Sequence, residues 1–294
     1  MLLGVCPTMS STPTDSPLPP SVDAALTERA ESGDLELPVL PATISQVLDL
    51  SQDPDCDIQE VTTLIERDQS LAAHVLHIAN SSAFSPTQPI VSLQQAITRL
   101  GLSTLCEVTV AIVLKGSAFE VPGFEPVLKD LWRHSAATGV FAKEVARTLR
   151  RNVEGAFLCG LLHDIGKPVT LSILPKVCKA ARVKLTEEIA EAAMDRHHEV
   201  MGALLVREWA LPSWVETVTR YHHDYENAEQ HQTEAMVTCL ADNLAHWAMK
   251  SNKKISEDEL LELSVLGDLD LYEEDLRKLL DGRDHAVENA MAFV

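Results

Sequence analysis

The sequence predicts an all-α fold with two lobes. From Leu37 onward, apolar residues recur at intervals of three or four, which is the spacing of one helix face, and no stretch alternates convincingly between apolar and polar residues as a strand would. The run from Gly116 to Pro126 interrupts this rhythm with two glycines and two prolines. Because Gly and Pro are the strongest local breaks in helical structure, this run is the best internal boundary, with a helical lobe on each side.

Two segments precede the boundary. Residues 1–36 are rich in Pro, Ser and Thr, and we expect a disordered leader there because the segment has too little apolar content to be buried. Residues 37–118 form the N-terminal lobe, in which Asp57 suits an N-cap and Gly101 follows a helix ending at Leu100, where a left-handed residue is favoured. The predicted helices of this lobe cover residues 43–52, 58–67, 69–80 and 92–115.

The second lobe covers residues 127–250 and contains every candidate functional residue. Gly166 is predicted to end one helix and Pro168 to begin the next. Residues 251–294 follow as an acidic helical tail with no evident chemistry. The tail's apolar face is predicted to consist of Leu271, Leu276, Leu279 and Leu280. The predicted helices of the second lobe cover residues 127–149, 153–164, 185–209, 213–222 and 233–249.

Composition limits the classes of partner. The chain has 294 residues, and its 24 basic against 44 acidic residues give a net charge of −20. This charge disfavours nucleic acid and anionic membranes, so proteins or small molecules are the expected partners. The six cysteines are scattered, which is typical of a reducing compartment, and we expect a cytoplasmic protein. No uninterrupted apolar run approaches the ~18 to 20 residues that span a bilayer.

The most informative motif is the pair His163-Asp164, which follows Leu161-Leu162 and closes an apolar run. Adjacent imidazole and carboxylate groups can both bind one divalent metal. Successive side chains on a helix diverge by ~100°, so both reach one ion only if it lies off a helix end, which Gly166 would supply. The second lobe holds further candidate ligands, enough for a two-metal hydrolytic site. These further candidates are His134, His198, His222, His223 and Asp242.

Each candidate has an ordinary alternative, since a single histidine is more often solvated or bonded to a backbone carbonyl than bound to metal. We favour His198 over its neighbour because Gly202, four residues later, would let another helix pack close to that face. In the doublet His222-His223 at least one ring should point away on a regular helix. Asp242 is an acidic residue in an apolar helix and needs a cation or several donors.

Lys167 could hold a phosphate, or it could be an ordinary exposed lysine. The remaining histidines lack acidic or imidazole partners in the sequence, and we expect them to be structural. This set comprises His74, His77, His231, His246 and His285.

The residues His134, His163, Asp164 and Asp242 resemble the ligand pattern of the HD superfamily of metal-dependent phosphohydrolases. Several longer stretches resemble the HDOD family, the HD-related output domain, over about residues 36–250. These stretches are residues 37–41, 67–71, 78–82, 96–101, 198–205 and 209–212. The resemblance implies a two-lobed helical HDOD fold with one HD-type lobe, in an output module of bacterial signalling proteins.

The additional histidines His198, His222 and His223 resemble the extended ligand set of the HD-GYP phosphodiesterases, which hydrolyse cyclic di-GMP. However, the residues after His223 are Asp-Tyr-Glu-Asn-Ala, with no Gly-Tyr-Pro tripeptide, so hydrolysis of cyclic di-GMP is not expected.

Two hypotheses follow from the resemblance. In the first, the chain is a cytoplasmic HDOD-type regulatory output protein that keeps one or two divalent metals, with iron or manganese favoured, and acts on signalling protein partners or a phosphorylated small molecule or nucleotide. In the second, it is a metal-dependent phosphohydrolase, with Asp164 and Lys167 in catalytic roles. The metal ligands are the same in both: His134, His163, Asp164, His198, His222, His223 and Asp242.

Overall fold

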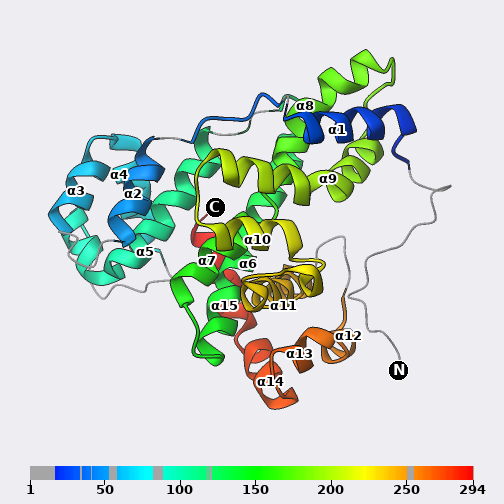
Figure 1. The fold of residues 1–294 in the computed structure, drawn as a ribbon. Helices are drawn as coiled ribbons and strands as arrows, with labels where there is room; N and C mark the ends of the chain where they lie inside the picture. Colours follow the sequence, from blue (N-terminus) through cyan, green and yellow to red (C-terminus); the bar gives the residue numbers. More distant parts are fainter. Residues whose placement is uncertain are drawn as a thin grey trace.

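Every regular element in the described part of the chain is a helix, which confirms the all-α prediction. The computed structural model describes residues 17–33, 35–40, 42–52, 58–81, 89–117, 119, 121–249 and 255–293. The helices form a small lobe and a larger one, seen at the left and right of Figure 1.

The small lobe contains four helices that match the predicted ranges to within about two residues. They are α2 (Ala42–Gln52), α3 (Ile58–Glu66), α4 (Gln69–Ala79) and α5 (Leu93–Ser117). At Gly101 the backbone leaves helical geometry, with φ 79° and ψ 161°, and the helix then resumes, so the predicted break after Leu100 is a kink within α5. The predicted N-cap Asp57 lies outside the described residues.

The large lobe holds the helices predicted to carry the chemistry. They are α6 (Glu125–Thr148), α7 (Val153–Leu162), α8 (Gly166–Ala180), α9 (Glu187–Glu208), α10 (Ser213–Tyr221), the short 3-10 helix η1 (Tyr225–Asn227) and α11 (Gln232–Met249). Glycines allow these helices to approach closely. A Cβ at Gly160 would lie 2.7 Å from the Gly139 backbone, where α7 crosses α6, and one at Gly202 would lie 3.1 Å from the Gly166 nitrogen, where α9 crosses α8.

The expected disorder of residues 1–36 is wrong for the part that the structure describes. A helix, α1 (Pro20–Ser32), has Pro at its first turn and ends at Gly33, which has φ 70°. Leu18, Val22 and Leu26 are buried, and the helix packs on α8 and α9 (Figure 1). The apolar residues recur at four-residue intervals, so a helical pattern was present, but the high Pro and Ser content of the segment obscured it.

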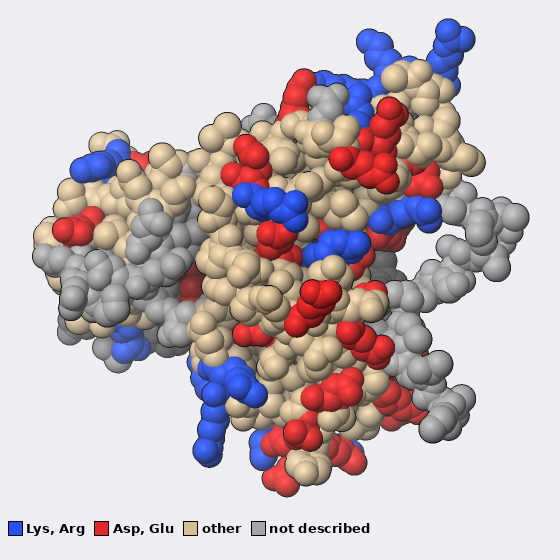
Figure 2. Space-filling view, in the orientation of Figure 1, with Lys and Arg blue, Asp and Glu red and all other residues tan. Residues whose placement is uncertain are grey.

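The C-terminal tail is helical, as predicted, and it packs against the large lobe. It contains α12 (Glu257–Leu261), α13 (Ser264–Asp268), α14 (Glu273–Asp281) and α15 (Arg283–Ala292). Phe293 packs on Phe157 of α7 with ring centroids 5.2 Å apart, and Arg283 donates a 2.7 Å hydrogen bond to the Ala248 carbonyl at the end of α11. Acidic side chains gather over this region at the bottom of Figure 2.

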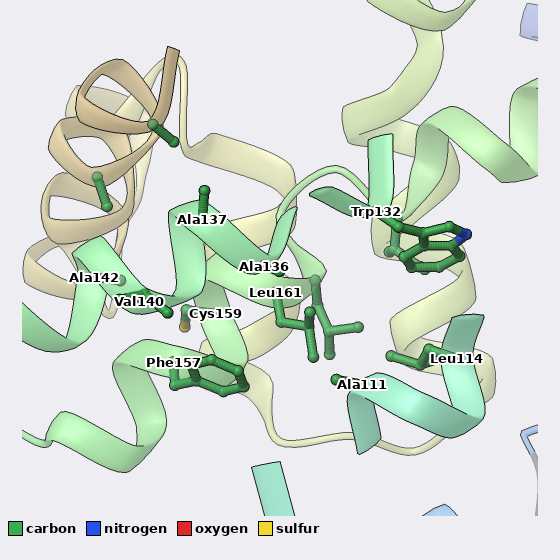
Figure 3. Packing of buried hydrophobic residues seen from close by; sticks show 14 of the residues in the cluster. Ala111, Leu114, Trp132, Ala136, Ala137, Val140, Ala142, Phe157, Cys159 and Leu161 are labelled. Atoms are coloured by element: carbon green, nitrogen blue, oxygen red, sulfur yellow. The ribbon is translucent and has the colours of Figure 1, made fainter. Parts of the chain in front are cut away.

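One large connected cluster of buried apolar side chains runs through both lobes, and a small second cluster of Val47, Leu64 and Cys106 lies in the small lobe. Figure 3 shows part of it, with Ala111 and Leu114 of α5 facing Trp132 of α6 and Leu161 of α7. A Lys143–Glu107 ion pair of 2.7 Å joins α6 to α5 beside this cluster. Helix α5 of the small lobe therefore contacts the large lobe through both apolar packing and an ion pair.

One stretch, Gly155–Ala180, is long and apolar enough to cross a membrane by length and composition alone. Most of its apolar window, 83%, is buried inside the structure.

Candidate metal centre

The His163-Asp164 pair lies in a tight turn between two helices. α7 ends at Leu162 and α8 begins at Gly166, so the pair leaves the helix at the place that Gly166 was expected to supply. A Cβ at Gly166 would lie 1.8 Å from the His198 carbonyl oxygen. Only glycine lets α8 start this close to α9, and this approach brings Asp164 next to His198.

The other candidate ligands converge on this turn from four helices. His134 is on α6, His198 is on α9, and Asp242 is on α11. His222 and His223 follow the last residue of α10, where the chain turns. The ligand atoms of both rings lie within 4.8 Å of one another and of that of His198, so neither ring points away from the site as a regular helix would require.

The Asp164 carboxylate lies between two sets of imidazoles. Its Oδ2 is 3.3 Å from His163 Nε2 and 3.9 Å from His134 Nε2. Its Oδ1 is 3.5 Å from His198 Nε2 and 3.9 Å from His222 Nε2. The two oxygens of Asp164 therefore face different histidines: Oδ2 faces His163 and His134, and Oδ1 faces His198 and His222.

The second carboxylate, Asp242, faces three imidazoles with a single oxygen. Its Oδ1 lies 2.8 Å from His134 Nε2, 3.3 Å from His246 Nε2 and 3.7 Å from His163 Nε2. The rings of His134 and His246 are stacked, with centroids 4.3 Å apart. His246, expected to be structural, thus lies in the cluster, and its spacing of four residues after Asp242 was the available signal.

The backbone fixes how three of the imidazoles are presented. His163 Nδ1 bonds the Gly160 carbonyl at 2.8 Å, His198 Nδ1 bonds the Asp195 carbonyl at 2.9 Å, and His222 Nδ1 bonds the Val218 carbonyl at 3.2 Å. Since Nδ1 is the donor in each bond, Nε2 of a neutral ring carries a lone pair. All three Nε2 atoms are buried and have no hydrogen-bond partner among the described residues.

Three unpaired buried nitrogens aimed at one carboxylate fit a metal site. Buried polar atoms are almost always paired, and leaving one unpaired costs ~1–3 kcal/mol. A bound cation would satisfy these atoms at once, whereas a purely structural cluster leaves them unexplained. The carbonyl partners resemble the outer hydrogen bonds that orient metal-binding histidines in general.

The donors form an outer and an inner group. The outer group is His134, Asp242 and His246, and the inner group is His198, His222 and His223; in each, the ligand atoms lie within 4.8 Å of one another. His134, His163 and Asp164 form a third set of the same dimensions that connects the two.

Burial and charge act in opposite directions on the ionisable groups. Burial alone would lower the pKa of His163, but the charges of Asp164 and Asp242 outweigh it and raise the pKa to about 10. Burial would also lower the pKa of Lys167. Its ammonium lies 2.6 Å from Asp164 Oδ2, however, and the attraction to this carboxylate outweighs burial and raises the pKa of Lys167.

The inner histidines are held neutral. Burial lowers the pKa of His198 to about 4 and that of His223 to about 3, and it lowers the pKa of His222 well below its usual range. Burial would raise the pKa of both aspartates, but neighbouring cationic groups hold each one well below its usual range. Neutral imidazoles and ionised carboxylates are the protonation states that bind metals.

All seven predicted ligands are therefore brought together. His197 is excluded, because its Nε2 bonds Asp23 of α1 at 2.8 Å, in agreement with the choice of His198. Gly202 packs against Gly166 as that choice assumed. His74, His77, His231 and His285 lie outside the three donor groups.

Comparisons with known proteins identify the family and the fold of the chain. The family model of the HDOD domain matches residues 37–225. A curated protein of uncharacterised function from Treponema pallidum (strain Nichols) is 27% identical over 207 residues, which is 66% of this chain but only 39% of that protein.

Two solved structures show the same fold. One, from Shewanella amazonensis SB2B, is provisionally named a metal-dependent phosphohydrolase; the match has a TM-score of 0.69 and 20% identity, and it covers 92% of this chain and 99% of the other. The second, from Marinobacter aquaeolei VT8, is provisionally named a signal transduction protein; this match has a TM-score of 0.67 and 22% identity, and it covers 93% of this chain and 66% of the other. The family match covers well over half of the chain, and the chain belongs to the HDOD domain family.

Proposed function

We propose that this chain is a metal-binding HDOD output protein whose second lobe holds one or two divalent cations. The observation that carries the proposal is the set of three buried, unpaired Nε2 atoms, on His163, His198 and His222, around the Asp164 carboxylate. The ligands proposed are the seven that converge: His134, His163, Asp164, His198, His222, His223 and Asp242.

The chain's own residues are organised before any cation binds. Backbone carbonyls hold the rings of His163, His198 and His222 so that their Nε2 atoms face the carboxylates. Asp164 has one oxygen toward each donor set and is suited to bridge two ions. A bound pair of divalent metals would supply a water of lowered pKa.

The donor types indicate a first-row transition metal. Five imidazoles and two carboxylates make up the proposed ligands, whereas calcium and magnesium prefer oxygen donors alone. Iron and manganese bind such mixed sets, and we propose one of these two.

We propose that the output is made in the cytoplasm through signalling protein partners or through a phosphorylated small molecule. Membership of the HDOD family and the provisional name of the Marinobacter structure support this role. The acidic net charge of −20 supports protein or small-molecule partners over nucleic acid.

The test is metal content, measured by elemental analysis on protein purified without an affinity metal column. We expect up to two equivalents of iron or manganese in the wild type, the same in a His231→Gln control, and a loss in His163→Gln. His231 lies outside the three donor groups. A wild-type protein that stays free of metal after anaerobic incubation with iron, manganese and zinc would contradict the proposal.

A second candidate function is hydrolysis of a phosphoester, and Lys167 is the observation that favours it. Its ammonium contacts Asp164 and its side chain is 15% exposed, at the edge of an otherwise buried site. There it could bind a phosphate group once a cation neutralises Asp164.

Turnover of bis(p-nitrophenyl) phosphate by metal-loaded protein tests this second candidate. We expect Lys167→Met to lower the rate ~100-fold or more, while Lys176→Met, at an exposed position paired with Glu36, leaves it unchanged. Absence of turnover in fully loaded wild type would leave the metal with a binding or structural role.

A further inference from the structure

His246 lies at the outer edge of the cluster, in a part of the chain that the family model does not cover. The match ends at residue 225, and His246 is on α11, one turn after Asp242. Its Nε2 is 3.3 Å from Asp242 Oδ1, and its side chain is 15% exposed while that of Asp242 is 3% exposed. The ring stacks on His134 with an angle of 27° between the planes.

Hydrogen bonding alone does not account for the imidazoles around this oxygen. A carboxylate oxygen has two lone pairs and can accept two N–H donors. His134 and His246 are close enough to donate, at 2.8 and 3.3 Å, and each would then have to carry its proton on Nε2. His163 Nε2 is left at 3.7 Å, buried and unpaired, and His134 Nδ1 is also buried and unpaired among the described residues.

A cation resolves this arrangement, because each ring can then be neutral and present a lone pair to the ion. The Nε2 atoms of His134 and His246 already lie near the same carboxylate oxygen, which is the arrangement of donors around a shared ion. The three residues of the outer group have ligand atoms within 4.8 Å of one another, as the inner group does.

We infer that His246 is an additional metal ligand, which makes the outer group a histidine-rich position for a divalent transition metal. The inference rests on the proposed metal site and adds an eighth donor to it. The outer position then has His134, Asp242 and His246 as its own ligands, whereas His198, His222 and His223 serve the inner one. His246 is the most exposed of the three outer ligands, with a side chain 15% exposed against 11% for His134 and 3% for Asp242.

The alternative is that His246 only orients Asp242 through a hydrogen bond. Removing such an outer partner typically weakens metal binding ~10–100-fold, without changing the atoms bound to the ion. Removing a ligand weakens it further and also changes the coordination. The test must therefore report both the affinity and the ligand field.

The experiment is a Co²⁺ titration of metal-free protein, followed by visible absorption and by elemental analysis. It compares wild type, His246→Gln and a control, His285→Gln, whose ring contacts Asn289 in the tail. We expect wild type and control to bind two equivalents. In His246→Gln the first equivalent should bind unchanged, and the second should bind more than ~100-fold more weakly with a shifted absorption band.

A second variant guards against misfolding as the cause. In His246→Ala, added imidazole should restore both the affinity and the absorption band of the second ion. Two unchanged equivalents in His246→Gln, or weaker binding with an unchanged band, would overturn the role of His246 while leaving the metal site intact. Failure of the wild type to bind Co²⁺ would overturn the metal site itself, and the ligand role of His246 with it.

Discussion

At the scale of single residues, the centre separates charged from neutral groups over a few ångströms. Without a cation, the two aspartates hold His163 and Lys167 protonated, and a bound metal would have to displace the His163 proton, while burial holds the inner histidines neutral. In the metal-free protein, the protonated side chains of His163 and Lys167 therefore partly neutralise the two buried carboxylates. This arrangement makes the metal-free protein sensitive to pH.

The free energy of unfolding of metal-free protein is expected to peak near pH 6.5. The folded pKa values of His198 and His223, about 4 and 3, lie below the ordinary 6.5. As pH falls below 6.5, these two histidines bind protons in the unfolded chain but not in the folded chain. Each one therefore lowers the free energy of unfolding by up to ~1.4 kcal/mol per pH unit. Glu199, with a pKa raised to about 7 by burial, offsets part of this loss.

On the alkaline side, the folded pKa of His163 is about 10, so its stabilisation is complete below 6.5 and is lost as pH rises toward 10. Urea unfolding across this range in the presence of a chelator checks both limbs. His198→Gln should flatten the acid limb only, and a wild-type stability that does not change between pH 4 and 6.5 would refute this account.

Gly166→Ala is expected to destabilise the protein by ~3 kcal/mol or more. The added Cβ would lie 1.8 Å from the His198 carbonyl, so α8 and α9 would have to separate and carry Asp164 away from His198. Gly267→Ala is the matched control, because a Cβ there meets nothing within 4 Å. Urea unfolding measures the difference, and equal stabilities for the two variants would contradict the proposed close approach.

At the scale of elements, α1 is an integral part of the large lobe although it lies outside the family match. Asp23 accepts from Arg196 at 2.7 Å and from His197 at 2.8 Å, both on the helix that carries His198. His197 is 5% exposed, so loss of Asp23 leaves a buried ring nitrogen without its partner.

Asp23→Ala is accordingly expected to lower the free energy of unfolding by ~1–2 kcal/mol. Glu28→Ala, at an exposed position of the same helix, should change it by less than about 0.5 kcal/mol. Thermal or urea unfolding of both variants checks the prediction, and similar losses in both would mean that the Asp23 contacts add nothing.

At the scale of the whole molecule, the proposed ions join helices that are distant in sequence. His134 and Asp242 are 108 positions apart and contact at 2.8 Å. A cation bound between α6, α9, α11 and the α7–α8 turn would cross-link the large lobe, whose apolar core is continuous with that of the small lobe.

Metal loading is therefore expected to raise the stability of the whole chain. At free metal 100 times the Kd, the gain is ~2.7 kcal/mol per site, which corresponds to a Tm increase of roughly 5–10 °C for a chain of this size. Calorimetry with and without a chelator measures the shift. Asp164→Asn should show none, and an equal shift in that variant would place the stabilising metal elsewhere.

The sequence by itself determined the helices and the lobe that contains the site. Helical periodicity and glycine and proline breaks are local signals, so the ranges of α2 to α7 and α9 to α11 agree with the prediction within a few residues, whereas for α8 only a start near Pro168 was predicted. The turn at His163-Asp164 and the close approach at Gly202 were also predictable. A glycine at a helix end allows the chain to turn, and a glycine at a helix crossing leaves room for the neighbouring backbone.

Only the tertiary structure decided which side chains meet. The burial of α1 depends on a surface of α8 and α9 more than a hundred residues away, and the inward position of both His222 and His223 depends on where α10 ends. The sequence predicts a structural role for His246, because nothing in the sequence places it beside His134, against which it stacks in the structure. Convergence of this kind follows from helix packing, which fixes distances between residues that no local pattern relates.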